Sequence, residues 1–292
     1  MPRTPRSHIG AGDNTIEFPF RLNTTVDEFV LADDLRILRM DEAARKRLLK
    51  IEDVEYDERG LLKSFVALPG CLLDDVATPD LDVNDQFCSS NYVFMAPSRE
   101  RAIDFNLALK LYRTSVSSLY IGYSTDRSTC FLAPPCYFGT EVLSIDENRL
   151  PELSRLTEQV TRSRTEPKFG LMGQMYLYAM SRQPRKEARF VEFAIILEML
   201  LLPTSSSELA YRFALRFAKL LSTHFGYERP DAYALGKAIY TTRSRLVHTG
   251  KDDAIDQVAA RAFEATRTLL AAYSADKGVF REENLDALCL SG

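Results

Sequence analysis

The sequence predicts an α+β N-terminal domain followed by an all-α helical bundle, and therefore a mainly α-helical protein. Three observations support this fold class. From Pro151 onward, short strand-like apolar runs give way to the three-and-four spacing of amphipathic helices. The charge balance changes at the same point, because residues 1–150 hold 17 Lys+Arg against 24 Asp+Glu while residues 151–292 hold 20 against 17. A length of 292 residues also favours two domains, which we expect at 1–150 and 151–292.

The N-terminal half contains short elements separated by turn residues. Residues 1–14 are rich in Gly and Pro and are expected to form a loose tail, and the acidic run at 52–58 is expected to be a solvated surface. Apolar periodicity predicts helices at 42–49 and, after a Ser98 cap, at 98–112, and strands at 61–73, 91–96, 119–123 and 129–132. These elements make a small α+β domain, and no motif in it announces a chemistry.

The C-terminal half contains four predicted helices, at about 188–202, 206–224, 231–248 and 255–273. The first is apolar on nearly all sides, as a central buried helix would be, and Pro203 ends it. Ser205 and Glu208 form a capping-box pattern before the second helix, which Gly226 ends. Pro230 suits the first turn of the third. Short links between such helices predict antiparallel neighbours and a bundle.

Composition argues against several classes of protein. Apolar residues make up 46% of the chain, which is enough for a core. No apolar run approaches the ~18 residues that span a bilayer, so we expect no membrane segment and a cytoplasmic protein. No Cys-x-x-Cys pair and no His/carboxylate cluster has ligand spacing, so neither a metal site nor a cofactor is expected.

A basic segment spans residues 155–189, where eight Lys and Arg residues face three Glu residues. Such a segment can follow a phosphate backbone, and binding would then weaken as salt rises. The alternative is a solvated linker and helix face.

The most informative segment ends the third predicted helix and reads Tyr240-Thr-Thr-Arg243-Ser244-Arg245-Leu-Val-His248-Thr-Gly250. A guanidinium can bind phosphate oxygens bidentately, and an imidazole can transfer a proton near neutral pH. Five helical positions leave the Arg243 and His248 side chains about 140° apart. They can converge only where the helix frays or turns, and Gly250 provides such a place.

This segment resembles the Arg-x4-6-His signature of the HEPN superfamily, and most closely its Apea-like branch. The resemblance extends through the segments beginning at Phe190 and Glu208 and covers roughly residues 185–275. It implies a helical bundle that dimerises and often acts as an RNA-directed endonuclease in toxin or phage-defence settings. Catalytic members often carry Asn, Asp or His directly after the arginine, where this chain has Ser244.

The resemblance implies that Arg243 and His248 are the catalytic pair and meet their symmetry mates across a homodimer interface. The RNA-binding or supporting residues would be Ser244, Arg245, Glu198, Arg212, Arg216 and Tyr240. RNA is the implied substrate, and an inhibitory or antitoxin partner is expected. We expect cleavage to need no metal or other cofactor.

Two interpretations remain open from the residues themselves. Glu198 lies in an apolar run, where a lone carboxylate is costly unless paired, and Arg212 and Arg216 are candidate partners. That ion pair would fix the bundle's register, whereas the alternative is that Glu198 holds Arg243 in place. At the level of function, the alternative is a non-catalytic dimerisation or interaction module with a sensing N-terminal domain, which Ser244 and the acidic N-terminal half favour.

Overall fold

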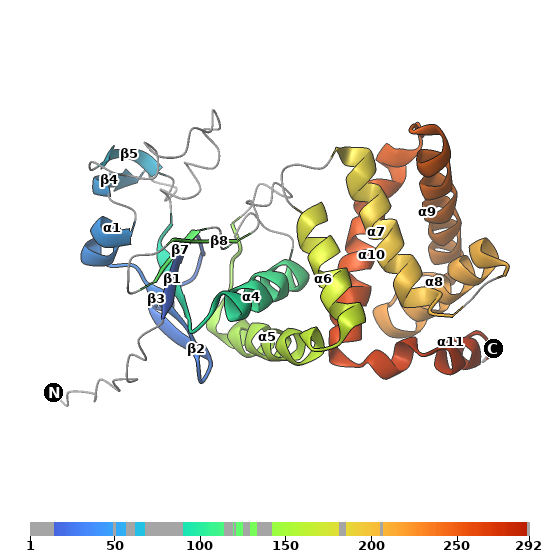
Figure 1. Ribbon diagram of the computed structural model, residues 1–292, viewed down its shortest axis with the longest axis horizontal. Coiled ribbons are helices and arrows are strands. Elements are labelled where there is room, and N and C mark those ends of the chain that lie inside the picture. Colours follow the sequence, from blue (N-terminus) through green and yellow to red (C-terminus); the bar gives the residue numbers. More distant parts are fainter. Residues whose placement is uncertain are drawn as a thin grey trace. The chain divides into compact units, whose positions relative to one another are not determined.

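The computed structural model describes residues 15–48, 51–56, 62–67, 90–113, 119, 121–124, 129–132, 142–180, 185–204 and 207–290. Contacts divide the chain into two compact units. Residues 1–109 and 114–155 form the sheet unit, and residues 110–113 and 156–292 form the helical unit. The chain is mainly helical, and a small antiparallel sheet precedes the helices (Figure 1). The tail expected at 1–14 lies outside the described residues.

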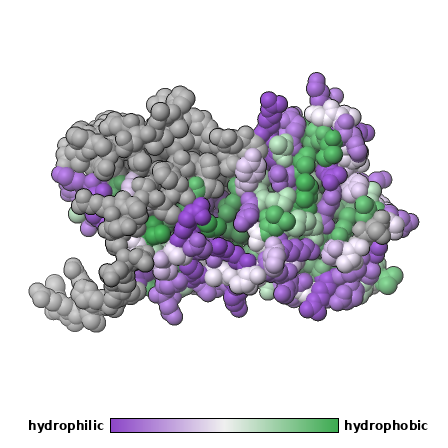
Figure 2. Space-filling model, viewed as in Figure 1, coloured by the Kyte–Doolittle hydropathy of each residue, from purple (hydrophilic) through white to green (hydrophobic). Residues whose placement is uncertain are grey.

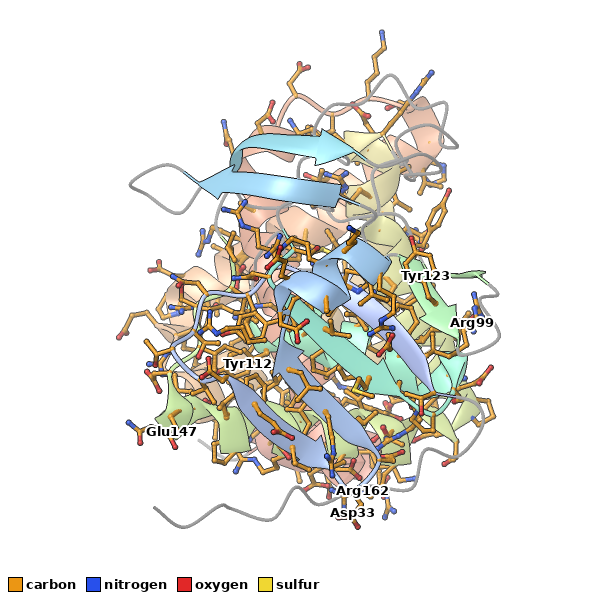
Figure 3. All side chains as sticks on the ribbon, turned by 90° about the vertical axis from the view of Figure 1, so that its left-hand side faces the viewer. Asp33, Arg99, Tyr112, Tyr123, Glu147 and Arg162 are labelled. Atoms are coloured by element: carbon orange, nitrogen blue, oxygen red, sulfur yellow. The ribbon has the colours of Figure 1, made fainter. Side chains whose placement is uncertain are left out.

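The sheet unit is built on six antiparallel strands. Their order is β2 (Glu28–Ala32), β3 (Leu35–Arg39), β6 (Tyr92–Ala96), β1 (Ile16–Phe20), β7 (Ile121–Ser124) and β8 (Thr129–Phe131). A separate hairpin pairs β4 (Ile51–Tyr56) with β5 (Leu62–Ala67). The strands of this unit are visible in Figure 3, where the label Asp33 marks the β2–β3 turn and the label Tyr123 marks β7.

The core of the sheet unit lies between the sheet and helix α4 (Arg99–Tyr112). The rings of Phe94 on β6 and Phe105 on α4 stack with centroids 4.1 Å apart, and both side chains are fully buried. The expected Ser98 cap is present, because the Arg101 backbone N–H donates to the Ser98 hydroxyl at 3.2 Å. A short helix, α1, covers Glu42–Leu48.

Four strands in this unit, β1 to β4, were not predicted. β1, β2 and β3 lie in segments whose polar and charged residues hide the alternation of the apolar ones. In β2 the buried Phe29 and Leu31 alternate with the exposed Glu28 and Val30, as a strand with one solvated face requires. Strand β4 covers residues 51–56 and so includes most of the acidic run at 52–58, for which no strand was predicted.

The helical unit contains α6 (Pro167–Ala179), α7 (Lys186–Leu201), α8 (Leu209–Phe225), α9 (Arg229–Thr249), α10 (Ile255–Ala275) and α11 (Glu282–Leu290), and most of α5 (Leu150–Arg164). The four predicted helices are confirmed, and each of their ends lies within three residues of the prediction. Helices α5, α6 and α11 were not predicted individually. None of the helices in the described part of the chain is long and apolar enough to cross a membrane.

Helix α7 occupies the centre of the helical unit, where it contacts α6, α8, α9 and α10. Its Phe193 packs with Phe263 of α10 and Tyr176 of α6, with ring centroids 5.3 and 5.9 Å apart. The expectation of a central buried helix is therefore confirmed. Hydrophobic residues still reach the surface in patches among hydrophilic ones on the face drawn in Figure 2.

Helices α8 and α9 form a closely packed antiparallel hairpin. A Cβ atom added at Gly236 would lie 3.0 Å from the Cα atom of Ala214, so the absence of a side chain allows this approach. Gly226 and Gly250 end the two helices with φ of 70° and 74°, in the left-handed region that glycine adopts readily. The capping box predicted around Ser205 and Glu208 is wrong at Glu208. This residue has φ 51°, makes no side-chain cap, and lies just before the first helical residue, while Ser205 lies outside the described residues.

Candidate functional site

The Arg243–His248 segment lies on the last two turns of α9. The helix stays regular as far as Thr249 and turns only at Gly250. The two side chains therefore leave the axis about 140° apart, as on an ideal helix. The expectation that fraying would bring them together within one chain is wrong, because Gly250 lies beyond His248 rather than between the two residues.

Arg243 is held from the neighbouring helix by Glu198 of α7. The Arg243 Nε and Glu198 Oε1 atoms lie 3.1 Å apart, and the side chains are 28% and 24% exposed. Neither atom has a well-directed hydrogen bond, so this contact is an ion pair without the aligned N–H of a full hydrogen bond. Burial raises the pKa of Glu198 above its usual range, and the positive charge of Arg243 offsets part of that rise.

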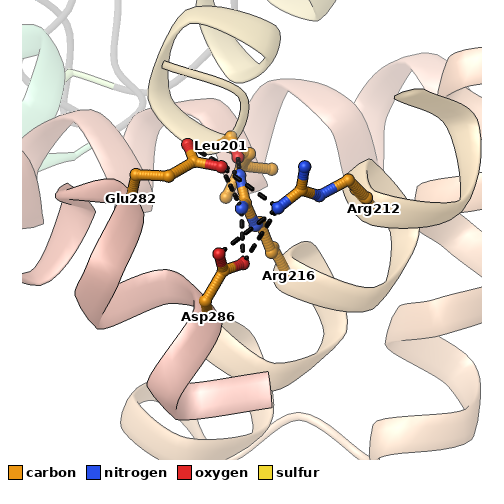
Figure 4. Close-up of polar contacts among 5 residues, drawn as sticks. All are labelled: Leu201, Arg212, Arg216, Glu282 and Asp286. Carbon is orange, nitrogen blue, oxygen red and sulfur yellow. Dashed lines mark hydrogen bonds and ion pairs between the residues drawn. The ribbon is translucent and has the colours of Figure 1, made fainter. Parts of the chain in front are cut away.

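Glu198 thus holds Arg243, which confirms the alternative interpretation of this carboxylate, and the prediction that Arg212 and Arg216 pair with it is wrong. Those two arginines point from α8 to the carboxylates of Glu282 and Asp286 on α11 (Figure 4). The prediction failed because no helix was expected in the segment that carries the two carboxylates.

Arg216 is the centre of this second cluster and is a structural residue. Its side chain is 1% exposed and donates to Glu282 at 2.5 Å, to Asp286 at 2.6 Å and to the Leu201 carbonyl at 2.7 Å. The last bond satisfies a carbonyl at the C-terminus of α7. Arg212 is 30% exposed and makes longer contacts of 3.2 Å to the same carboxylates. The cluster therefore ties three helices together.

His248 is exposed to solvent, one helical turn after the half-buried Ser244. The helix end beside it is fixed by Thr249, whose hydroxyl contacts the carbonyls of Arg245 and Lys251 at 2.8 and 2.9 Å. Arg245 is exposed and lies 3.8 Å from Asp252, whose carboxylate also accepts from the Ala254 backbone N–H at the start of α10. The imidazole is thus presented to solvent on an ordered support.

Tyr240 packs inside the hairpin rather than at the helix end. Its ring lies 5.7 Å from that of Phe213 on α8, at an interplanar angle of 50°. Of the residues assigned to the site, the structure brings together Glu198 and Arg243 in one place and Ser244, Arg245 and His248 at the exposed end of α9. Tyr240, Arg212 and Arg216 support the helices instead.

The basic segment at 155–189 is spread over α5, α6 and the start of α7. Lys168 lies 5.7 Å over the Tyr273 ring, and Lys186 pairs with Asp256 of α10. Arg162 donates to the Glu158 carbonyl on its own helix. Lys168, Lys186 and Arg162 thus already have partners within the chain, as the alternative of a solvated helix face allows.

Two tyrosines that the sequence did not single out line a hollow between α8 and α9, namely Tyr211 and Tyr233. Tyr211 is 56% exposed. The sequence could have indicated these two tyrosines, because their large rings lie outside the apolar stripe of each helix. Among the described residues, no group of three or more His, Cys, Asp or Glu side chains could hold a metal ion.

Comparisons of the chain with protein-family models, with curated proteins and with solved structures found no match.

Proposed function

We propose that the helical unit is a HEPN-like bundle and that the protein is a metal-independent endoribonuclease. The observation that carries the proposal is the end of α9. There an exposed imidazole stands on an ordered helix terminus, and a guanidinium one and a half turns earlier is oriented by a carboxylate. The Arg243 ion pair runs through Nε, so its terminal Nη groups can contact a phosphate.

The proposed reaction uses the nucleophile that RNA itself supplies. The ribose 2′-oxygen attacks the adjacent phosphorus as His248 removes its proton, and the bond from phosphorus to the 5′-oxygen breaks. The products are a 2′,3′-cyclic phosphate and a 5′-hydroxyl, which takes up a proton. Arg243 stabilises the charge that develops on the phosphoryl oxygens. DNA lacks the 2′-hydroxyl and resists this cleavage.

A homodimer is part of the proposal because Arg243 and His248 diverge within one chain. Two-fold symmetry brings the Arg243 of one copy and the His248 of the other to opposite sides of one phosphate. It also supplies a second imidazole for the leaving group. Val247, which is 53% exposed beside His248, gives such an interface an apolar contact.

We further propose a cytoplasmic toxin or phage-defence setting, with an inhibitory or antitoxin partner that restrains the nuclease. This setting rests on the resemblance of the Arg243–His248 segment alone.

The second candidate function is a non-catalytic dimerisation or interaction module with a sensing N-terminal domain. The engagement of Arg243 by Glu198 favours it, because a guanidinium already paired has less charge to offer a transition state. Ser244, which holds no charge, favours it as well.

The test is degradation of bulk RNA in EDTA by the full chain. We expect wild-type protein to cut RNA, and His248→Ala to lose about 10²–10⁴ in rate, the usual contribution of general acid–base catalysis. His224→Ala is a matched control, since His224 is also exposed and also stands two residues before a helix-ending glycine, Gly226. Arg243→Lys is expected to be severely impaired, because an ammonium keeps the charge but loses the planar fork.

Two results would decide against the nuclease. Retained cleavage by His248→Ala rejects the mechanism. RNA binding without cleavage by wild-type protein, lost in Arg243→Ala, establishes the interaction module instead. A strictly monomeric protein by light scattering, with and without RNA, rejects the two-fold site.

A further inference from the structure

A hollow of about 400 Å³ lies between α8 and the first turns of α9. Tyr211, Leu215 and Ala218 line it from α8, and Arg229, Pro230 and Tyr233 line it from α9. Its surface thus combines two large rings with a cationic side chain. Lys237, one turn beyond Tyr233, places its Nζ atom 6.0 Å from the centre of the Tyr233 ring. That distance is the outer limit of a cation–π contact, so the ammonium remains available to an anion.

The hollow and the end of α9 lie along one face of that helix. Lys237 and His248 are eleven residues apart, which places them within about 20° of each other around an α-helix. Both side chains are exposed, and the half-buried Ser244 falls between them on the same face. From Tyr233 to His248 the helix rises by about 22 Å. A chain of several nucleotides covers such a distance.

The charge of this face selects for a polyanion. Helix α9 carries no carboxylate after Asp231, and the next acidic residue in the chain is Asp252. The intervening segment carries Lys237 and His248 on this face and Arg245 about 60° from His248, whereas Arg243 points to Glu198 of α7. Cations that follow a backbone, next to rings on which planar groups stack, are the combination that binds single-stranded nucleic acid. An acidic peptide would use the cations but leave the two rings without a stacking partner.

We infer that the hollow between α8 and α9 is a base-binding subsite for single-stranded RNA. An unpaired base stacks against Tyr211 and Tyr233, Lys237 contacts a neighbouring phosphate, and the strand continues along α9 toward His248. Paired bases are stacked on each other and offer no free face, so the subsite selects single strands. The identification of RNA as the ligand rests on the proposed function, whereas the stacking and charge arguments do not.

The test measures binding of an octanucleotide of 2′-O-methyl adenosine to the full-length protein by calorimetry. Methylation removes the internal nucleophile, so binding is measured whether or not the protein cleaves RNA. Tyr211→Leu and Tyr233→Leu are each expected to weaken binding about tenfold, which corresponds to about 1.4 kcal/mol and lies in the range for one stacked base. Tyr211→Phe and Tyr233→Phe keep the ring and are expected to bind as wild type does.

Two further variants separate stacking from general effects. Tyr178→Leu is the matched control, because Tyr178 is also 56% exposed but lies on α6, outside the hollow, and it is expected to leave affinity unchanged. Lys237→Met is expected to weaken binding and to reduce the salt dependence by about one counterion. Circular dichroism confirms that each variant is folded.

The outcomes separate this inference from the proposed function. Wild-type affinity in both leucine variants overturns the subsite, even if the protein cleaves RNA through His248. Failure of the wild-type protein to bind the octanucleotide overturns it as well. Tyrosine-dependent binding without any cleavage of unmodified RNA supports the subsite and rejects the nuclease.

Discussion

Replacing Arg216 with methionine removes the buried guanidinium that joins α7, α8 and α11. The substitution keeps most of the apolar stem, so it tests the polar contacts rather than packing volume. Three groups lose a donor: the carboxylates of Glu282 and Asp286 and the carbonyl of Leu201.

The expected loss is about 3 kcal/mol in the free energy of unfolding. Removing one partner of a buried ion pair costs about 3–5 kcal/mol when the other charge stays buried. Here Glu282 and Asp286 are 23% and 46% exposed, so water and Arg212 can take over part of their solvation. The Leu201 carbonyl is left without this donor, which costs about 1–3 kcal/mol. The total expected loss therefore lies near the lower end of the range for removing one partner of a buried ion pair.

The measurement is thermal and urea unfolding followed by far-UV circular dichroism. A loss of about 3 kcal/mol lowers Tm by about 6–12 °C for a unit of this size. Arg212→Met is the matched control, because Arg212 contacts the same carboxylates from a partly exposed position. Its loss is expected to stay below about 1 kcal/mol. Equal losses in the two variants, or a loss below about 1 kcal/mol in Arg216→Met, refute the central role of Arg216.

The same cluster has a defined dependence on pH. Hydrogen bonding to Arg216 holds the pKa of Asp286 below its ordinary value of 3.8, with burial opposing the shift. A carboxyl whose pKa is lowered by folding stabilises the fold above its ordinary pKa and loses that contribution as pH falls toward the lowered value. The difference between wild type and Arg216→Met is therefore expected to shrink below pH 3.8. A difference that grows in acid contradicts the assignment.

Three further substitutions test the packing and the site. Burial raises the pKa of Glu198 despite the charge of Arg243, so wild-type stability falls as pH rises from the ordinary pKa of a glutamate to the raised one. The stability difference between Glu198→Gln and wild type should therefore shift in favour of the variant as pH rises from acid to neutral, and a shift in the opposite direction in urea unfolding contradicts this. Gly236→Leu places a side chain against the Ala214 backbone, so the free energy of unfolding is expected to fall by at least about 1–3 kcal/mol in urea unfolding. An unchanged urea midpoint would show that α8 and α9 can move apart without loss of stability. Tyr92→Phe removes the hydroxyl whose single proton faces the backbone carbonyls of Val26 at 2.8 Å and Thr24 at 3.1 Å, and a loss of about 1 kcal/mol should appear in thermal unfolding.

The helices of the helical unit were predictable because their signals are local. The apolar face of α8 and the stop residues Gly226 and Gly250 are visible in the sequence, and the observed helix ends follow them closely. Strand β3 was missed because it places charged Arg36 and Arg39 among its apolar residues and follows a turn of two aspartates, which gave the segment the composition of a surface. In retrospect, that aspartate pair between two alternating runs was a hairpin signal.

The side chains of the candidate site were predictable, but the choice between their alternative partners was not. Arg243 and His248 could be selected from residue type and spacing. The pairing of Glu198 with Arg243 depends on which face of α9 packs against α7, and periodicity alone does not determine that choice. Arg243 and His248 do not converge within one chain, because α9 continues through both residues and ends only at Gly250.

The carboxylates that surround Arg216 are synthesised well after Arg216 itself. Asp286 follows Arg216 by 70 residues, so at bacterial or eukaryotic ribosomal speeds of about 5–20 residues per second it emerges about 4 to 14 seconds later. During that interval α7 and α8 can pair, but the guanidinium between them has neither α11 carboxylate to receive it. The helical unit therefore acquires its final stability only after α11 is synthesised, and a nascent chain that lacks α11 stays more open to proteases and chaperones than one that carries it.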